Sequence, residues 1–308
     1  MTFLFYTDIH LTGRNPPNRK DKYPQTLISK LEEVYGIART SAVDFVLFGG
    51  DLFDSHRCYA YEVLAQAVNV FRTAPCATWM LMGQHDLIGY NRSSFEYSTA
   101  HFVSELSCGK LLVLNEPREF CGVVFHPCHV FDKLPEVLQG ISGTDKKTHI
   151  VMAHSLVTER RAVFDTILVD SLPVTPARLV LCGDYHGGFG PIKRDGTLYY
   201  NPGAMARQKA TTSEMSREVF CALVEVNGGI IKVSPQRITN ALPASSVFLE
   251  KEPEVEVAGS VDVDPFIERL EQIACEATDI FELLQMMATP GTDPRILRYI
   301  EGFRKAEK

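Results

Sequence analysis

Five apolar segments of this 308-residue sequence are each followed directly by residue types that bind metal ions. Ligand sites in α/β sheets lie at the carboxyl ends of strands, so five such endings can converge on one point. Carboxylates and imidazoles together suit Mn, Fe or Zn, and in a two-metal site one carboxylate can bridge both ions. A single Asp-x-His would be a weak signal, whereas five ordered matches form a specific pattern. The segments are FLFYT before Asp8 and His10, VLFGG before Asp51 and Asp54, WMLM before Gly83, His85 and Asp86, HIVMA before His154, and LVLC before Gly183, Asp184 and His186.

The elements that must position these residues alternate between strand and helix at the start of the chain. Short apolar runs at residues 3–7, 43–48 and 77–82 predict buried strands. Apolar residues recur at helical spacing over residues 24–40, and a second helix is expected over 60–73. This order predicts an α/β fold with parallel neighbouring strands. Farther along, we expect a helix over 93–106 and strands within 111–114, 122–126, 148–153, 178–182 and 197–233.

A change of composition near residue 240 divides the sequence. We expect a catalytic domain over residues 1–240 and an exposed, acidic linker over 241–264. Residues 265–308 predict a helical hairpin, because an Asp-Pro pair at 264 and another at 293 each supply an N-cap followed by proline. Two helices of this length cannot bury their apolar stripe by themselves. We therefore expect the hairpin to pack on the main domain or on another protein.

Composition excludes several classes of protein. The 31 Lys and Arg against 38 Asp and Glu give a net charge of −7, which rules out a polybasic binder that holds nucleic acid by bulk charge. No apolar run approaches the roughly 18 residues of a membrane span. The N-terminus also lacks the positive region of a signal peptide. The eight cysteines form no CxxC pair, which predicts reduced thiols in the cytoplasm.

The ordered strand-end motifs resemble the calcineurin-like metallophosphoesterase superfamily, whose pattern is DxH, GDxxD, GNH[DE], H and GHxH. The resemblance spans residues 1 to about 205. Within the superfamily the sequence is most similar to the SbcCD-type double-strand-break repair nucleases, in GGDLFD at 49–54, YNPGAMAR at 200–207 and the loop after the first motif. The resemblance implies an α/β fold in which a two-sheet β-sandwich is flanked by helices, followed here by the C-terminal helical hairpin.

The resemblance also implies two divalent metal ions, with Mn²⁺ expected and Mg²⁺ as the alternative. One ion would be held by Asp8, His10 and His186, and Asp51 would bridge to the second ion. The ligands expected to complete the second ion are Gln84, His154 and Asp184.

A catalytic role follows by the same resemblance for His85. This histidine would protonate the leaving oxygen or stabilise the phosphorane, and Asp86 would orient it. The physical logic agrees, because two metals clamp a phosphodiester, lower the pKa of a bound water and neutralise the developing charge. A histidine beside such a site can serve as the acid near neutral pH.

Two residues depart from the family pattern. Gln84 stands where Asn is expected, and Asp184 stands where the first His of GHxH is expected. Gln offers the same amide oxygen from about one bond farther away. Asp184 replaces a neutral imidazole by an anionic oxygen, which favours Mn or Mg over Zn and weakens the Lewis acidity of the ion. Both changes fall on the second metal, so they can compensate each other.

Three basic residues are candidates to contact the substrate phosphate. Arg14 lies in a charged loop after the first motif, His56 follows the second motif, and Arg207 follows the Asn-Pro-Gly turn that the resemblance places at the rim of the active site. For Arg14 and His56, a solvated loop is an equally good interpretation.

The preferred hypothesis is a manganese-dependent DNA nuclease, an exonuclease with possible endonuclease activity in DNA repair or recombination. The resemblance implies a homodimer that binds an SbcC-type coiled-coil ATPase, and residues 265–304 match the need for docking helices. The alternatives are a phosphatase or cyclic-nucleotide phosphodiesterase with the same metal site, and a catalytically silent scaffold. No membrane association is expected.

Overall fold

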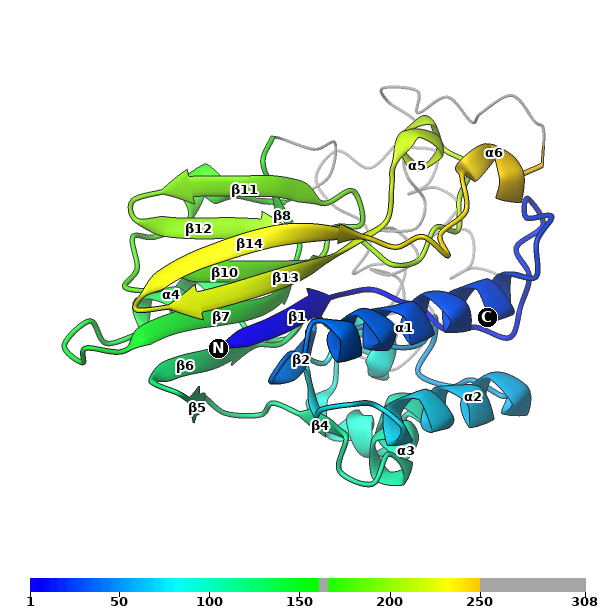
Figure 1. The fold of residues 1–308 in the computed structure, drawn as a ribbon, viewed down its shortest axis with the longest axis horizontal. Helices are drawn as coiled ribbons and strands as arrows, with labels where there is room; N and C mark the ends of the chain where they lie inside the picture. The colour runs from blue at the N-terminus through cyan, green and yellow to red at the C-terminus, as the bar shows by residue number, and fades with distance from the viewer. Residues whose placement is uncertain (161–165, 250–308) are drawn as a thin grey trace, which may run out of the picture. The chain divides into compact units, whose positions relative to one another are not determined.

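Two six-stranded sheets face each other in the computed structural model, which describes residues 1–160 and 166–249 (Figure 1). The first sheet has the order β14-β13-β1-β2-β3-β4. Its four strands β1 to β4 are parallel, and β13 and β14 add an antiparallel edge. The bounds are β1 Thr2–Tyr6, β2 Phe45–Phe48, β3 Thr78–Met80, β4 Leu111–Val113, β13 Phe220–Asn227 and β14 Ile230–Arg237.

The second sheet has the order β11-β12-β10-β7-β6-β5. Strands β6, β7, β10 and β12 are parallel, and the edge strands β5 and β11 run antiparallel to their neighbours. A short parallel pair, β8 (Val157–Thr158) with β9 (Ile167–Leu168), lies apart from both sheets in the hydrogen-bonding pattern. The bounds are β5 Arg118–Phe120, β6 Val123–Cys128, β7 Thr148–Ser155, β10 Leu179–Asp184, β11 Phe189–Arg194 and β12 Thr197–Asn201.

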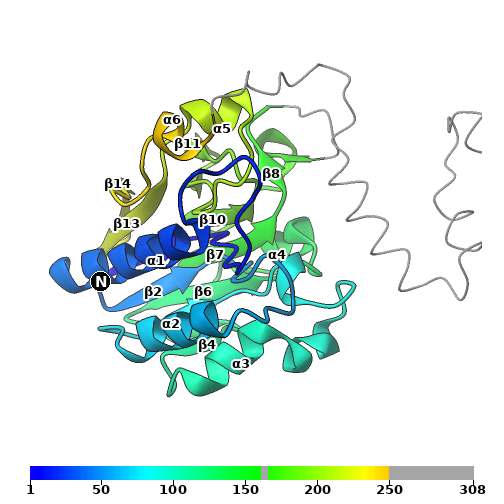
Figure 2. The same ribbon diagram turned by 90° about the vertical axis from the view of Figure 1, so that its right-hand side faces the viewer.

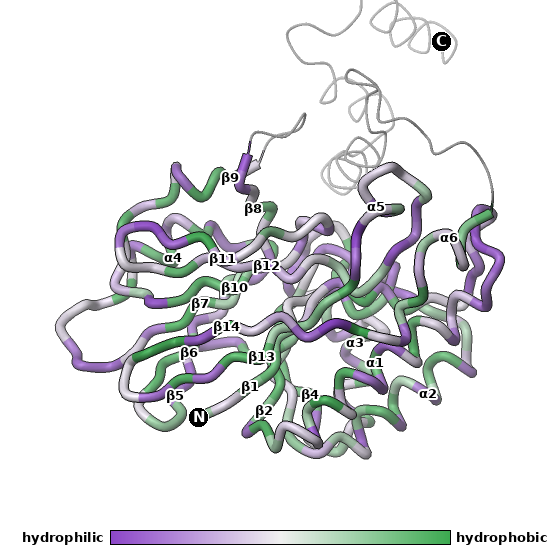
Figure 3. Tube along the Cα trace, turned by 45° about the horizontal axis from the view of Figure 1, so that its top comes forward, coloured by the Kyte–Doolittle hydropathy of each residue, from purple (hydrophilic) through white to green (hydrophobic). Residues whose placement is uncertain are grey.

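Alternating side chains fix which face of each strand is buried between the sheets. In β1, Phe3 and Phe5 point into the core shared by the two sheets, whereas Leu4 and Tyr6 join the core under the helices. The shared core contains a row of stacked rings, with centroids 5.3 Å apart for Phe3 and Phe45 and 4.3 Å apart for Phe45 and Trp79. Figure 3 shows hydrophobic stretches along the strands and hydrophilic residues in the connecting loops.

Helices cover the outer face of the first sheet, where α1, α2 and α3 lie together (Figure 2). The second sheet packs its outer face on the small helix α4. This confirms the predicted α/β fold of two sheets flanked by helices. The helices are α1 Tyr23–Thr40, α2 Tyr61–Arg72, α3 Thr99–Leu106, α4 Leu134–Gln139, α5 Thr212–Ser216 and α6 Ala244–Val247, with 3₁₀ turns η1 Gln84–Asp86, η2 Arg92–Tyr97 and η3 Val169–Ser171.

Two predicted boundaries are wrong. The helix expected over 93–106 is divided, because Ser98 has extended backbone and its side chain caps α3 by accepting from the amide of His101 at 3.2 Å. The exposed linker expected from residue 241 is not present over residues 244–248, because α6 and Phe248 pack on the domain, with Val247 and Phe248 almost fully buried. The predicted hairpin over 265–308 lies outside the described residues. No helix in residues 1–160 and 166–249 has the length and apolar character needed to cross a membrane.

Candidate metal centre

The strand-end residues of both sheets meet at one place, as the sequence predicts. Asp8 and His10 follow β1, Asp51 follows β2, and η1 with Gln84, His85 and Asp86 follows β3. In the second sheet, His154 lies near the end of β7, Asp184 ends β10 and His186 lies two residues beyond that end. Main-chain bonds join the first two strand ends, since the amides of Asp8 and His10 donate to the carbonyls of Gly50 and Asp51, each at 3.1 Å.

Four of the expected metal ligands have left-handed backbone. The φ angles are 54° at Asp8, 46° at His10, 59° at Asp51 and 74° at Asp184. Such conformations cost residues other than glycine roughly 1–3 kcal/mol each, and they persist only where the surrounding structure imposes them. In each case the left-handed residue lies where the chain leaves a strand.

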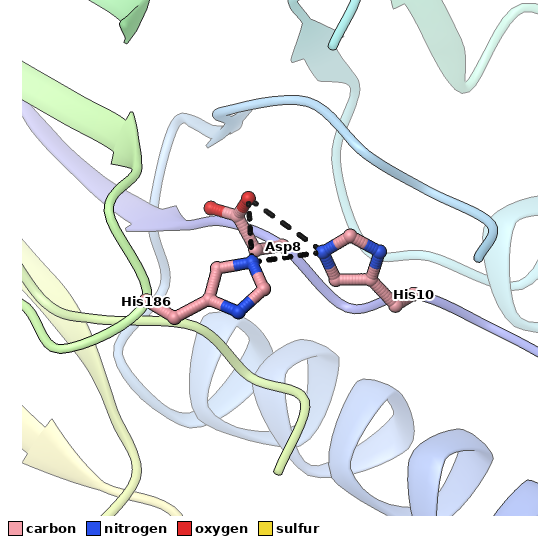
Figure 4. Close-up of side chains that lie close together, drawn as sticks. All are labelled: Asp8, His10 and His186. Atoms are coloured by element: carbon pink, nitrogen blue, oxygen red, sulfur yellow. Dashed lines mark hydrogen bonds and ion pairs between the residues drawn. The ribbon is translucent and has the colours of Figure 1, made fainter. Parts of the chain in front are cut away.

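The first ligand group consists of Asp8, His10 and His186, whose candidate ligand atoms all lie within 4.8 Å of one another (Figure 4). The two Nε2 atoms of His10 and His186 are 3.1 Å apart. Oδ1 of Asp8 lies 3.8 Å from Nε2 of His10 and 3.7 Å from Nε2 of His186. One cation placed between them can reach three protein ligands.

The second ligand group lies around His154. Its Nε2 is 3.4 Å from Oδ2 of Asp51 and 2.7 Å from Oε1 of Gln84. Its Nδ1 lies 2.6 Å from the carbonyl oxygen of Gly49. This contact holds a ring proton on Nδ1, so Nε2 is the atom that would bind a metal once it gives up its own proton, as in many metal-binding histidines. Asp8, Asp51 and His154 together also satisfy the spacing of a metal site.

Two buried carboxylate oxygens show that a cation fits here. Oδ1 of Asp8 and Oδ2 of Asp51 are fully buried and have no hydrogen-bond partner within the described part of the chain. The other oxygen of each carboxylate is bonded: Oδ2 of Asp8 accepts from the Thr7 hydroxyl and the Asp184 amide, and Oδ1 of Asp51 accepts from the His85 amide. A buried anionic oxygen without a partner is costly, and a divalent cation between these oxygens and the imidazoles removes that cost.

Electrostatic effects agree with this assignment. Burial acts to raise the pKa of Asp51, but the charges of His154, His85 and His10 outweigh it and hold that pKa well below its usual range. The pKa of Asp8 is lowered in the same way by His10, His154 and His186, against the effect of burial. Burial raises the pKa of Asp184 to about 6, and the charges of Asp8 and Asp51 add to this shift. So many carboxylates in one place need positive charge to balance them.

Gly83 allows the third strand end to approach the second. A Cβ at this position would lie only 2.0 Å from Oδ1 of Asp51. A glycine is therefore required before Gln84 and His85. The buried carboxylate of Asp86 fixes the same loop, because it accepts from the amides of Gly83, Asp51 and Leu52 at 2.9–3.0 Å.

His85 is oriented differently from the sequence-based prediction. Its Nδ1 lies 2.9 Å from the carbonyl oxygen of Asp54, and its ring meets that of His10 edge-on with centroids 4.8 Å apart. Asp86 acts on His85 through the main chain of the loop, since both its oxygens are bonded to backbone amides. The Asp54 carbonyl therefore has the role that we assigned to Asp86. Sequence reasoning missed it because a main-chain group leaves no residue-type signal.

The three basic residues expected to contact the substrate phosphate differ in how exposed they are. Arg14 is exposed in the loop after His10, and His56 is half-buried, with its carbonyl accepting from the Thr99 amide at 2.8 Å. Arg207 is only 4% exposed, and its guanidinium donates to the carbonyls of Arg217 and Leu242. The expected phosphate contact does not fit this buried position, because the side chain is used to join three chain segments.

The two departures from the family pattern contact each other. Nε2 of Gln84 donates to Oδ1 of Asp184 at 3.0 Å while its Oε1 faces His154. We expect that Gln84→Asn alone and Asp184→His alone each weaken metal binding about tenfold, because each leaves the other residue without its partner. The double variant should lose less than the sum, with a coupling of about 1 kcal/mol. Titration calorimetry of all four proteins with Mn²⁺ tests this, and additive losses would refute the compensation.

Two mixed sheets with histidines and carboxylates gathered at their strand ends define the class of metal-dependent phosphoesterases. Residues 1–188 match the family model described as calcineurin-like phosphoesterase, and the chain belongs to this family.

Solved structures with the same fold include two phosphatases. A dimetal phosphatase from Danio rerio has a TM-score of 0.54 at 13% identity, with 78% of this chain and 99% of that chain covered. A purple acid phosphatase from yellow lupin (Lupinus luteus) seeds has a TM-score of 0.50 at 10% identity, with 79% and 52% covered. At such identities the likeness shows the fold alone. A comparison with curated protein sequences finds no match.

Proposed function

We propose that this chain is a manganese-dependent DNA nuclease, an exonuclease with endonuclease activity, that hydrolyses phosphodiester bonds. The observation that carries the proposal is the exposure of the first ligand group on one side. The His186 side chain is 47% exposed, whereas Asp8 and His10 are 0% and 2% exposed. The metal centre is therefore buried at Asp8 and His10 and open to solvent at His186. Such a centre can receive a phosphate group in the middle of a long polymer, because the protein does not have to enclose the substrate.

The residues around the centre supply the remaining chemistry. When bound, two divalent ions clamp a phosphate and lower the pKa of a water, and Mn²⁺ suits a donor set of carboxylates, imidazoles and an amide. The Asp54 carbonyl holds one ring proton on Nδ1 of His85, so the proton for the leaving oxygen would be a second one, carried on Nε2 by the imidazolium form. Asp51 anchors the backbone of His85 by accepting from its amide at 2.9 Å.

Asp54 supports the nuclease branch of the resemblance. It is the last residue of the GGDLFD motif, and its carbonyl orients His85. Its Oδ1 accepts from Gln208 Nε2 at 2.7 Å, which ties the motif to the segment that follows YNPGAMAR. The two motifs that resemble the SbcCD-type nucleases therefore meet beside the metal centre.

The direct test is cleavage of linear double-stranded and single-stranded DNA with Mn²⁺. We expect degradation that requires the metal and is absent from the Asp51→Asn variant prepared in parallel. Release of mononucleotides would establish the exonuclease, and nicking of a circular substrate would establish the endonuclease. A purified protein that binds two ions yet leaves every DNA substrate intact would overturn the proposal.

A phosphatase or cyclic-nucleotide phosphodiesterase is the second candidate, favoured by the burial of Arg207. That burial removes one of the expected contacts to a DNA phosphate. Phosphate release from small nucleotides without DNA cleavage would support this candidate. The catalytically silent scaffold predicts that no Mn²⁺ binds, so calorimetry separates it from both enzymes.

We further propose that residues 265–304 dock on an SbcC-type coiled-coil ATPase. Their amphipathic pattern is the support, and they lie outside the described residues. Co-purification of the full chain with a candidate ATPase, compared with a chain ending at residue 254, tests the idea. Equal recovery of the two chains would show that the helices are not the docking element.

A cytoplasmic setting is proposed from the thiols. The seven cysteines in the described residues are all free. Burial raises the pKa of Cys128 and of Cys221 to about 12, so these thiols are protonated and unreactive at neutral pH. Buried, unpaired thiols are typical of proteins from a reducing compartment.

The proposed homodimer has a candidate surface at the start of α2 and along α3. Tyr61 is 81% exposed and Phe102 is 51% exposed, and neighbouring apolar side chains are also exposed. Bonds between Thr99 and the 56–58 segment hold these two elements together. Such a patch commonly marks an interface.

Phe102→Glu should weaken self-association at least about tenfold in analytical ultracentrifugation, equivalent to about 1.4 kcal/mol. Ile230→Glu, an exposed apolar site on β14, should not; equal effects would refute this surface.

A further inference from the structure

A short segment behind the metal centre supports its ligands through main-chain bonds. Residues 204–206 run alongside the loops that carry Asp8 and His186. The amide of Ala204 donates to the carbonyl of His186 at 3.0 Å, that of Met205 to Thr7 at 3.0 Å, and that of Ala206 to Asp8 at 2.9 Å. Three successive amides therefore fix the main chain of two ligands in the first group.

The opposite edge of this segment is held by buried cations. Arg217 donates from Nη1 to the carbonyl of Ala204 and from Nη2 to that of Ala206, both at 2.7 Å. Between them, Nζ of Lys30 donates to the carbonyl of Met205 at 2.7 Å. Each carbonyl thus accepts from a cation, while the amide of the same residue donates to the metal-site loops.

Lys30 is unusual because it is almost fully buried. Lys30 is 1% exposed and lies on the inner face of α1, beside Leu27 and Leu31. Burial holds the pKa of its ammonium group well below the ordinary value, with nearby arginines adding to the effect. A buried cation is costly unless its donors are used. Arg217 is balanced by Glu214, which accepts from its Nε and Nη2 at 2.9 Å.

The apolar side chains of this segment explain why donors from elsewhere are needed at this place. Ala204, Met205 and Ala206 offer no polar side-chain group that could fix the position of the segment. Hydrogen bonds from a charged donor are about twice as strong as neutral ones. Arg217 can therefore fix the segment at the carbonyls of residues 204 and 206, and the amine of Lys30 donates to the carbonyl between them. Polarising the carbonyls of residues 204 and 205 also strengthens the bonds donated by the amides of residues 205 and 206, because each carbonyl shares a peptide group with the following amide.

We propose that Lys30 and Arg217 are positioning residues of the metal centre, which act through the main chain of residues 204–206 on Asp8 and His186. The proposal rests on the metal site and not on the choice of DNA as substrate. It assigns the larger effect to the ion of the first group, because the segment bonds to two ligands of that group and, of the residues grouped with His154, only to Asp8.

The experiment measures Mn²⁺ binding to full-length Lys30→Met and Arg217→Lys. Lys30→Met keeps the side-chain volume but removes the Nζ donor. Arg217→Lys keeps the charge but removes the guanidinium group, whose two Nη atoms donate to two carbonyls at once. Supporting groups of this kind change metal affinity about 10–100-fold. We expect such a loss at one of the two sites by calorimetry, and loss of the spin-coupled Mn pair in the electron paramagnetic resonance spectrum. The other site should change less than about threefold.

Arg194→Met is the matched control. Nη1 of Arg194 donates to the carbonyls of Val169 and Leu172 at 2.5 and 2.6 Å, so its loss also leaves carbonyls unbonded, but in a segment that holds no metal ligand. It should lower the thermal midpoint and leave both Mn²⁺ affinities unchanged. The proposal is overturned if the variants at 30 and 217 only lose stability as the control does, or if both sites weaken equally. If Lys30→Met does not fold, Arg217→Lys decides alone. These binding results are independent of whether DNA is cleaved.

Discussion

Asp51→Asn should reduce phosphoester hydrolysis about 10³-fold or more, equivalent to about 4 kcal/mol of transition-state stabilisation. The structure places this carboxylate between the two ligand groups. Its Oδ2 lies 3.4 Å from Nε2 of His154 and 3.8 Å from Nε2 of His10, which belong to different groups. An asparagine offers one neutral oxygen, which cannot balance two divalent ions. We therefore expect both the loss of activity and a fall in bound metal from two ions to at most one.

A second effect follows from the other oxygen of the same carboxylate. Oδ1 of Asp51 accepts from the His85 amide at 2.9 Å. If the asparagine amide group turns its NH₂ toward that amide, the loop with Gln84 and His85 must move. The thermal stabilisation produced by Mn²⁺ should therefore be smaller than in the unmodified protein, because it depends on metal binding to the folded state.

The measurement combines metal analysis with hydrolysis of bis(4-nitrophenyl) phosphate. Asp44→Asn is the matched control, because Asp44 precedes the same strand β2 at its opposite end, where it accepts from the Thr2 amide at 2.8 Å. The control should keep two ions and normal turnover. A variant at 51 that retains two tightly bound ions and more than about a tenth of the activity would contradict the bridging role.

The strand ends were predictable because their signal is local. An apolar run followed by Asp or His marks both the strand and the side chain at its carboxyl edge, and parallel neighbours bring such edges together. The residues at 8, 10, 51, 154 and 186 illustrate this. The α1 helix was likewise predictable from its apolar spacing.

The long-range partners of individual side chains were not predictable. Lys30 follows the charged pattern of a solvated helix position, yet it is buried because a carbonyl of residue 205 lies within reach. Arg207 resembles a phosphate ligand after a turn, yet carbonyls 10 and 35 residues along the chain bind it. The contact between Gln84 and Asp184 spans 100 residues. Such pairs depend on how two sheets pack, which no short pattern records.

His85→Ala is expected to lower turnover about 10²–10⁴-fold, the usual contribution of a positioned general acid. The ring lies beside His10, with centroids 4.8 Å apart, and the carbonyl of Asp54 binds its Nδ1. In the imidazolium form its Nε2 also carries a proton, and this is the one that it can present to the leaving oxygen. Since Asp8, His10, His186 and the His154 group hold the ions in this assignment, the variant should keep both of them and bind substrate with a nearly unchanged KM.

Metal content decides between this role and its alternative. His85 also lies within metal-binding distance of His10 and Asp51, so its loss would remove an ion if it were a ligand. Turnover, KM and Mn²⁺ stoichiometry should be measured together on His85→Ala and on the control His101→Ala. His101 lies in α3 and packs against Phe95 of η2. Lost turnover with two ions retained identifies the acid. A parallel loss of one ion makes His85 a ligand. A substrate whose leaving group has a low pKa separates the two roles further, because such a group departs without a proton. It should restore turnover if the variant lacks only the acid, and it should fail to do so if the variant lacks a metal ion.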